Sequence, residues 1–185
     1  MATVSFTRME DGTAKEYRYL RGVYMDFHKN VADEVLLMLG KLAGPTLGYK
    51  IDRYQHSLQS ASRAQRDGAD EETVVCALLH DIGDTIAPEN HSQLAAAVLR
   101  PYVSEKNHWI IEHHGMFQGY YYFHHFGQDR DSRDAYRGHE HFEACAEFCA
   151  RWDQTSFDPD YDNLNLDVFE PLVRKLFEAP KYEYI

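Results

Sequence analysis

The chain has 185 residues, of which 44% are hydrophobic and 26% are charged, and its formal net charge is −11. These values predict one globular domain and exclude a largely disordered chain. The negative charge argues against a nucleic-acid surface, and we find neither a secretory signal nor an apolar run long enough to span a membrane. With three cysteines and no signal, we expect a cytoplasmic protein with reduced thiols, in which Cys145 and Cys149 pack in the core.

The sequence indicates a series of helices, marked by capping residues and apolar stripes. Thr13 and Glu16 have the spacing of a capping box, Asp52 is a typical N-cap, and Pro88 suits the first turn of a helix. Apolar residues recur with helical period from Val31 onward. In chain order, the expected helices cover residues 13–27, 31–42, 52–66, 70–81, 88–100, 104–114, 142–152 and 166–177.

Two segments lie outside this helical pattern. Residues 3–6 are a candidate for a short strand, and residues 119–138 are irregular and rich in aromatic, arginine and aspartate residues. No other segment alternates with the period of a strand. We therefore predict an all-α protein with a single domain over residues 1–185. Its metal-binding core would span about residues 52–153, with the terminal helices packed on it.

The most informative motif is His80-Asp81, which follows the apolar run 77–79 and precedes Gly83. Imidazole and carboxylate groups are ligands that suit zinc, iron, manganese or nickel. Adjacent residues on a helix point about 100° apart. Both side chains can therefore reach one site only near a helix end, where Gly83 relaxes the backbone. Asp81 has two oxygens and could bridge two metal ions.

Other histidines and a second aspartate could complete such a pair of ions. His56 and Asp153 would join His80 at one ion, and His91 would hold the second together with His113 or His114. We favour His114, with His113 as its neighbour or as an alternate ligand. The histidines that we expect to be ordinary surface or core residues are His28, His108, His139 and His141.

These motifs resemble the HD-domain superfamily, and most closely its mixed-valent di-iron oxygenases, which are related to myo-inositol oxygenase. The similar segments are Gln55-His56-Ser57-Leu58-Gln59, Ala77-Leu78-Leu79-His80-Asp81-Ile82-Gly83, Asn90-His91, Ile111-Glu112-His113-His114 and Trp152-Asp153. The resemblance implies an Fe(II)/Fe(III) pair with dioxygen as co-substrate and Asp81 as the bridging ligand. Carried over residue by residue, the iron ligands would be His56, His80, Asp81, His91, His114 and Asp153.

The resemblance also implies a reaction, the oxidative cleavage of the carbon–phosphorus bond of a small 1-hydroxyphosphonate. Gln118 stands at about the position of a phosphonate-binding lysine in the aminophosphonate oxygenase of this branch. This departure favours a modified amine, as in (R)-1-hydroxy-2-(trimethylammonio)ethylphosphonate, which would give glycine betaine and phosphate. We expect this small organophosphonate as the partner, and neither nucleic acid nor a membrane.

Two features favour oxygenation over the phosphoester hydrolysis that is common in the superfamily. Asp84 stands where phosphohydrolases often carry a basic residue, and its carboxylate would repel an anion and attract a cation. The aromatic run 117–123 could attract a quaternary ammonium group or could simply be core. The expected substrate-binding residues are Asp84, Gln118, Tyr120, Tyr121, Tyr122, Arg130, Arg133 and Arg137. The three arginines could hold a phosphonate or pair with the aspartates of their own loop.

Two other functions stay open at the level of sequence. One is a metal-dependent phosphohydrolase, and the other is a non-catalytic metal-binding or regulatory module. Substrate-dependent consumption of dioxygen would separate the oxygenase from both. In some relatives a tyrosine guards the vacant iron position, and Tyr24 and Tyr49 are the candidates in this chain.

Overall fold

The computed structural model describes residues 2–182 and contains helices and turns but no strand in that range. The prediction of an all-α protein is confirmed. The α-helices are α1 (Ala14–His28), α2 (Val31–Gly40), α3 (Arg53–Arg66), α4 (Glu71–Leu79), α5 (His91–Leu99), α6 (Glu105–Gln118), α7 (Phe142–Phe148) and α8 (Leu166–Phe177). Short 3-10 helices cover Met9–Asp11, Pro88–Asn90, Gly119–Tyr121, Phe123–Phe126 and Ser132–Tyr136, and a π-helical turn covers Cys149–Asp153.

The predicted caps start four of these helices. The Thr13 side chain accepts the backbone N–H of Glu16, whose carboxylate accepts the backbone N–H of Thr13, and this reciprocal pair is a capping box. The side chains of Asp52, Asp70 and Ser104 each accept a backbone N–H three residues later, at 2.8, 2.8 and 3.3 Å. Each cap satisfies a donor that the first turn of a helix leaves unpaired, and so sets where the helix begins.

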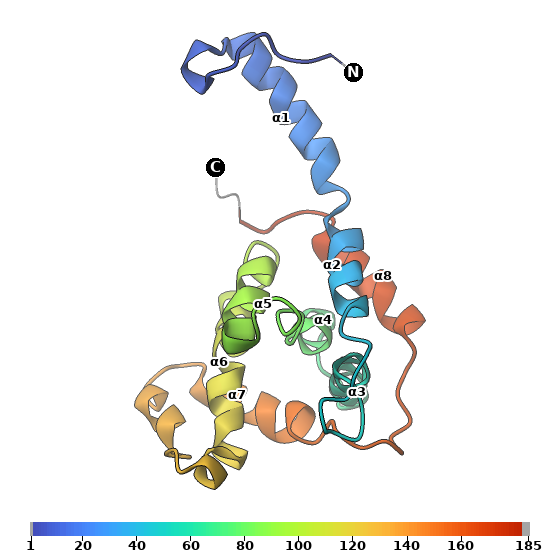
Figure 1. Cartoon of the computed structure of the whole chain (residues 1–185), viewed down its shortest axis with the longest axis vertical. Coiled ribbons are helices and arrows are strands. Elements are labelled where there is room, and N and C mark those ends of the chain that lie inside the picture. The colour runs from blue at the N-terminus through green and yellow to red at the C-terminus, as the bar shows by residue number, and fades with distance from the viewer. Residues whose placement is uncertain (1, 183–185) are drawn as a thin grey trace.

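The body of the protein is organised around α4, as Figure 1 shows. All residues from Thr73 to Leu79 are buried, and α4 contacts α3, α6 and α8. Helix α6 packs between α5 and α7, and the π-helical turn that follows α7 packs on α3. All three cysteines are reduced and buried, as the core assignment of Cys145 and Cys149 predicts. The layer of helices around α4 therefore brings α3, α6 and the π-helical turn to one place.

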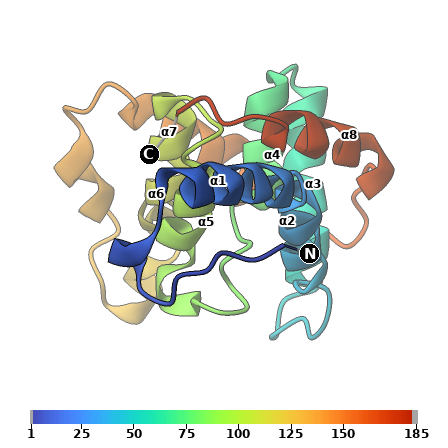
Figure 2. The same ribbon diagram turned by 90° about the horizontal axis from the view of Figure 1, so that it is seen from above.

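Helix α1 projects from this body (Figures 1 and 2). None of its 15 residues, all of which the structure describes, is buried. The large apolar side chains Tyr24, Met25 and Phe27 are each at least 60% exposed. Among residues 2–182, no helix combines the length and the apolar character needed to cross a bilayer.

The structure differs from the expectations of the sequence in three places. Residues 3–6 are not a strand, because the backbone N–H of Ser5 donates to the Glu16 carboxylate at 2.7 Å instead of to a neighbouring strand. Helix α6 does not stop at Gly115 but continues to Gln118. A Cβ on Gly115 would lie 2.7 Å from the Ser92 Oγ, so this glycine permits close packing of α6 on α5. The helix predicted over 142–152 changes at Cys149 from α to π.

Candidate metal centre

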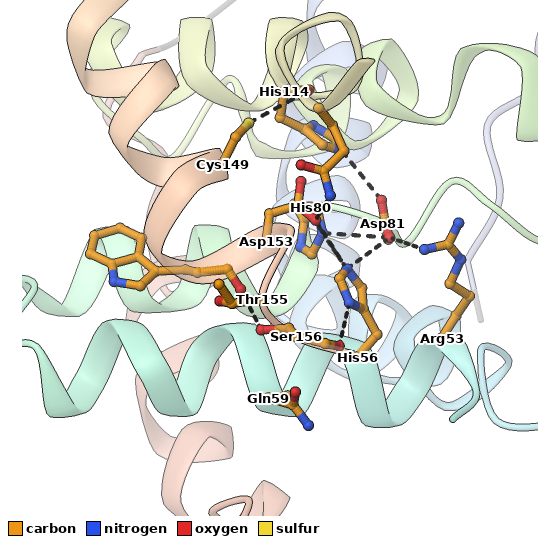
Figure 3. Close-up of polar contacts among 12 residues, drawn as sticks. Arg53, His56, Gln59, His80, Asp81, His114, Cys149, Asp153, Thr155 and Ser156 are labelled. Atoms are coloured by element: carbon orange, nitrogen blue, oxygen red, sulfur yellow. Dashed lines mark hydrogen bonds and ion pairs between the residues drawn. The ribbon is translucent and has the colours of Figure 1, made fainter. Parts of the chain in front are cut away.

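Six side chains that the sequence singled out converge in the interior. Figure 3 shows five of them, His56, His80, Asp81, His114 and Asp153. They come from five separate parts of the chain, so only the packing of helices around α4 brings them together. His56 lies on α3, His80 is the C-cap of α4, Asp81 follows it, His91 begins α5, His114 lies on α6, and Asp153 ends the π-helical turn. All except His91 are buried.

Asp81 lies at the centre of this cluster, and its two oxygens face different pairs of histidines. Its Oδ2 is 3.4 Å from the Nε2 atoms of both His56 and His80. Its Oδ1 is 3.4 Å from the Nε2 of His91 and 3.3 Å from the Nε2 of His114. A carboxylate placed in this way can give one oxygen to each of two metal ions.

Asp153 adds a second carboxylate on the side of His56 and His80. Its Oδ1 lies 3.4 Å from the Nε2 of His56 and 3.8 Å from that of His80. Its Oδ2 is buried and has no hydrogen-bond partner within residues 2–182. A buried carboxylate oxygen without a partner is costly, and a bound cation would satisfy it.

The four histidines are oriented so that Nε2 is the free nitrogen. The Nδ1 atoms of His56, His80 and His114 lie 2.9, 2.8 and 2.7 Å from the backbone carbonyl oxygens of Ser156, Ala77 and Ile111, respectively. An Nδ1–H group that donates to a carbonyl fixes both the ring and the tautomer, as is usual for metal-ligating histidine. His91 has a longer contact of 3.2 Å, from its Nδ1 to the Pro88 carbonyl oxygen.

The contact between His56 and His80 is a direct test of whether a cation fits. Their Nε2 atoms are 3.0 Å apart. If both rings donate from Nδ1, neither neutral ring carries a proton on Nε2, so two lone pairs would face each other. A metal ion or an added proton removes this repulsion. Together with the unpartnered oxygen of Asp153, this contact shows that the donor set fits a metal.

The charges in the cluster also suit a cation. Burial by itself would raise the pKa of Asp81, but its interactions with His80, His114 and Arg53 outweigh burial and hold this pKa well below its usual range. The pKa of Asp153 is lowered in the same sense, because its hydrogen bond with His56 and the nearby imidazoles outweigh burial. Burial lowers the pKa of His80 to about 4. Ionised carboxylates beside a neutral imidazole are the protonation states that metal binding requires.

A family model described as the HD domain matches residues 53–158, more than half of the chain. The chain belongs to the HD-domain family. The matched range includes all six of the converging side chains and ends just after the π-helical turn. No curated protein matches the sequence. HD domains are typically metal-dependent hydrolases or related enzymes, which agrees with a buried group of histidines and aspartates that can hold metal.

The two histidines of the doublet His113-His114 lie in different surroundings. His114 is buried in the cluster, whereas His113 stacks on the Trp109 ring with a centroid distance of 4.2 Å. The Nδ1 of His113 donates to the Trp109 carbonyl at 2.9 Å. Because neighbouring residues on a helix point in different directions, only one of the two can face the metal centre.

Other contacts hold the side chains of the cluster in place. The Gln118 Nε2 donates to the Asp153 Oδ1 at 3.0 Å, so this predicted substrate-binding residue contacts a member of the cluster. The Cys149 Sγ donates to the His114 carbonyl at 3.5 Å. A Cβ on Gly83 would lie 2.6 Å from the His91 carbonyl oxygen, so this position needs glycine for the loop after His80-Asp81 to approach α5.

The other residues predicted to bind substrate lie in different surroundings from one another. Tyr122 is 42% exposed, and its pKa is raised first by partial burial and then by Tyr49 and Asp153. Tyr121 packs against the core, which is one of the two roles that the sequence left open for the aromatic run. The guanidinium carbons of Arg130 and Arg133 lie over the Tyr120 ring, 4.1 and 3.7 Å from its centroid. Arg137 pairs with Asp134 at 2.7 Å, on the surface of its own loop.

Asp84 is close to the centre but is already engaged. Its Oδ2 lies 2.9 Å from the Arg53 Nε, and its Oδ1 lies 3.3 Å from the His91 Nδ1. The sequence analysis did not single out Arg53, whose Nη1 is 3.5 Å from the Asp81 Oδ2. A basic residue three positions before a ligand histidine shares its helix face, and this spacing could have drawn attention to it.

An aromatic stack covers the outer side of His56. The Phe157 ring lies on His56 with a centroid distance of 4.4 Å, and Tyr49 lies on Phe157 at 5.0 Å. Of the two tyrosines considered as guards, Tyr49 is therefore next to the centre, whereas Tyr24 is 60% exposed on the projecting α1. Phe157 was missed because nothing in its local sequence indicates that it reaches a histidine on α3.

Proposed function

We propose that this HD domain holds two iron ions and is an oxygenase that cleaves the carbon–phosphorus bond of a small 1-hydroxyphosphonate. The observation that supports it most is the position of Asp81, with one oxygen toward His56 and His80 and the other toward His91 and His114. Asp153 would complete the first ion position. Asp81 would be shared between the two positions.

The chemistry of the donor set supports iron as the metal. The cluster offers four imidazole nitrogens and two carboxylates and no thiolate, and sets of this kind suit non-haem iron. When bound, the two iron ions would supply the activation of dioxygen and the transfer of electrons. The protein's own residues position the substrate, keep water out and maintain the charge of the site.

The rim of the centre offers groups of both signs for a zwitterionic substrate. Arg53 is partly exposed beside Asp81, and its guanidinium can hold an anionic phosphonate by charge-assisted hydrogen bonds. Tyr49 and Tyr122, which are 50% and 42% exposed, offer ring faces to a trimethylammonium group. Because Asp84 is engaged with Arg53 and His91, we assign the cationic head to these rings instead of to Asp84.

The proposed reaction balances without an external reductant. The C1–H and C1–P bonds of the substrate break, C1 gains one oxygen to become a carboxylate carbon, and phosphorus gains the other as phosphate. Both oxygens come from one dioxygen molecule, which accepts the four electrons released. For (R)-1-hydroxy-2-(trimethylammonio)ethylphosphonate, the products are glycine betaine and phosphate.

The test is to load the protein with iron without oxygen, measure the iron content and record electron-spin resonance after partial oxidation. We expect two irons per chain and the signal of a coupled Fe(II)/Fe(III) pair. Adding the trimethylammonio substrate should then consume dioxygen and release phosphate in equal amounts. A protein with two irons that consumes no dioxygen with any 1-hydroxyphosphonate would contradict the proposal.

A phosphohydrolase is the second candidate, and Arg53 is the observation that favours it. From the sequence alone, the Asp84 carboxylate is expected to repel a phosphoester. The Arg53 guanidinium offsets this charge, so the repulsion is removed. The same protein, loaded with Mn²⁺ and kept without oxygen, would then release phosphate from a phosphomonoester. Phosphate release under those conditions, with no dioxygen consumption in the first assay, would favour hydrolysis.

A further inference from the structure

His91 differs from the other three histidines of the centre in two ways. Its side chain is 24% exposed, whereas those of His56, His80 and His114 are at most 2% exposed. Its only backbone acceptor, the Pro88 carbonyl, is 3.2 Å from Nδ1, which is longer than the corresponding contacts of the other three. The backbone therefore holds the His91 ring less firmly than it holds the other three.

Asp84 supplies the missing support. Its Oδ1 lies 3.3 Å from the His91 Nδ1, so His91 can donate to a carboxylate as well as to a carbonyl. A carboxylate behind a ligating histidine fixes the ring and raises the basicity of the nitrogen that binds the metal. The carboxylate contacts of His56, His80 and His114 are made by Nε2, and their Nδ1 atoms face backbone carbonyl oxygens.

Arg53 holds Asp84 in this position. Its Nε lies 2.9 Å from the Asp84 Oδ2, and its Nη1 lies 3.5 Å from the Asp81 Oδ2. The guanidinium carbon is 5.2 Å from the centre of the Tyr49 ring, which limits its movement. A continuous chain of contacts therefore runs from His91 through Asp84 and Arg53 to the bridging carboxylate Asp81.

The two metal positions are unequal in their protein ligands. Four side chains surround the first position: His56, His80, Asp81 and Asp153. Three surround the second: Asp81, His91 and His114. The second position has fewer ligands, and one of them, His91, is partly exposed, so it depends more on whatever orients His91.

We propose that Asp84, held by Arg53, is the positioning residue for His91 and sets the affinity of the second metal position alone. This rests on the two-metal part of the proposed function and not on its oxygen chemistry. The second position is then the one that exchanges metal and that an incoming ligand can reach. Asp84 acts through His91 and does not itself bind the metal or the substrate.

The test is a titration of metal-free protein with Co²⁺, followed by calorimetry and by visible absorbance, with no substrate present. Wild type should bind two equivalents. Asp84→Asn should bind the first as wild type does and the second about 10- to 100-fold more weakly. Asp134→Asn is the matched control, since Asp134 is also paired with an arginine but lies in the surface loop, and it should behave as wild type.

Two further variants separate positioning from a general effect of charge. Asp84→Glu keeps the charge but moves the carboxylate, so it should also weaken the second equivalent, whereas a purely electrostatic role predicts wild-type affinity. In a His91→Ala background, Asp84→Asn should have no additional effect. If Asp84→Asn does not fold, as judged by circular dichroism, Asp84→Glu carries the test.

Several outcomes would overturn the inference. Asp84→Asn could bind both equivalents as wild type does, could lose both equally, or could add to the effect of His91→Ala. A wild type that binds a single Co²⁺ would overturn it too. Because the titration involves no dioxygen, a protein that behaves as expected here but has no oxygenase activity would refute only the proposed reaction.

Discussion

Helices α1 and α3 are nearly equal in length, 15 and 14 residues, yet α3 has eight buried residues and α1 has none. The buried helix is the more polar of the two. Its buried residues include His56, Gln59 and three serines, whereas α1 exposes Val23, Tyr24, Met25 and Phe27. Hydrophobic content alone therefore does not decide which helix is inside.

The difference lies in side-chain size and in available partners. The small Ser and Ala residues of α3 let it pack closely on α4 and on the π-helical turn. The Gln59 amide donates to the Asp158 carbonyl and accepts the Asp158 N–H, at 2.8 and 3.1 Å. The Ser62 Oγ donates to the Leu58 carbonyl and accepts the Leu164 N–H. Polar groups that find such partners can be buried without a large cost. The hydroxyls of Ser57 and Ser60 are buried without a partner among residues 2–182, so their small size is what permits their burial.

The largest effect should come from Asp81→Ala, in the buried cluster beside α3, and should be on metal content and activity. The variant loses the shared carboxylate, so the two bound cations would face one another with less negative charge to compensate them. We expect loss of at least one iron and of all activity, while circular dichroism shows that the helices persist. Iron analysis of the purified variant decides this, because two retained irons per chain would exclude a bridging role.

The histidine doublet gives the next largest effect. His114→Ala should empty the second metal position, because His114 is buried in the cluster. His113→Ala should retain both metals and lose its stacking on Trp109, worth about 0.5–1.5 kcal/mol, together with its hydrogen bond to the Trp109 carbonyl. Metal content and denaturant unfolding of the two variants distinguish these roles. The reverse order of metal loss would show that the wrong histidine was assigned.

Overpacking α3 should destabilise the body. Ala61 is fully buried, and Ala61→Leu would add three carbons where no space is free. We expect the free energy of unfolding to fall by about 1–3 kcal/mol. Urea denaturation measures this, and Arg21→Leu on the exposed α1 is the control, with little expected change. Equal effects of the two substitutions would remove the contrast between the helices.

The free energy of unfolding should depend on pH through Glu72, at the start of α4. Burial would raise the pKa of Glu72, but hydrogen bonds from Lys181, Ser104 and Asn107 lower it to about 2. The pKa of Glu72 is lower in the folded state than in the unfolded state, so ionised Glu72 stabilises the fold. This contribution to the free energy of unfolding is complete above about pH 4.5 and is lost as the pH falls towards 2. After allowance for solvent screening, it is about 1–2 kcal/mol.

Glu72→Gln should therefore lower the free energy of unfolding at pH 7, and the difference from wild type should shrink at pH 3. Urea denaturation at the two pH values gives the comparison. Glu143→Gln, on an exposed position of α7, is the control and should show no such trend. A constant difference between Glu72→Gln and wild type would mean that the carboxylate charge is not responsible.

The smallest effect should come from Gly22→Ala in α1. A Cβ at this position would meet nothing within 4 Å, and alanine favours a helix over glycine by about 1 kcal/mol. We expect slower amide exchange within α1, by about fivefold, and an unchanged unfolding midpoint for the body. A higher midpoint would indicate that α1 unfolds together with the body and is not independent of it.

The sequence by itself determined the features that depend on near neighbours. The capping residues Thr13, Asp52, Asp70 and Ser104 start helices where predicted, because each cap bonds to a backbone group three residues away. The apolar periodicity likewise determined the all-α class. The His80-Asp81 motif pointed to a metal site, since these ligand types at a helix end have few other uses.

Only the tertiary structure decided which groups meet across the fold. It placed His114 and not His113 in the cluster, paired Asp84 with Arg53, and laid Phe157 on His56. It also continued α6 through Gly115, where the sequence predicts a stop. These outcomes depend on distances between segments up to about 100 residues apart in the chain. They are set by how the helices pack around α4, and no local pattern records that packing.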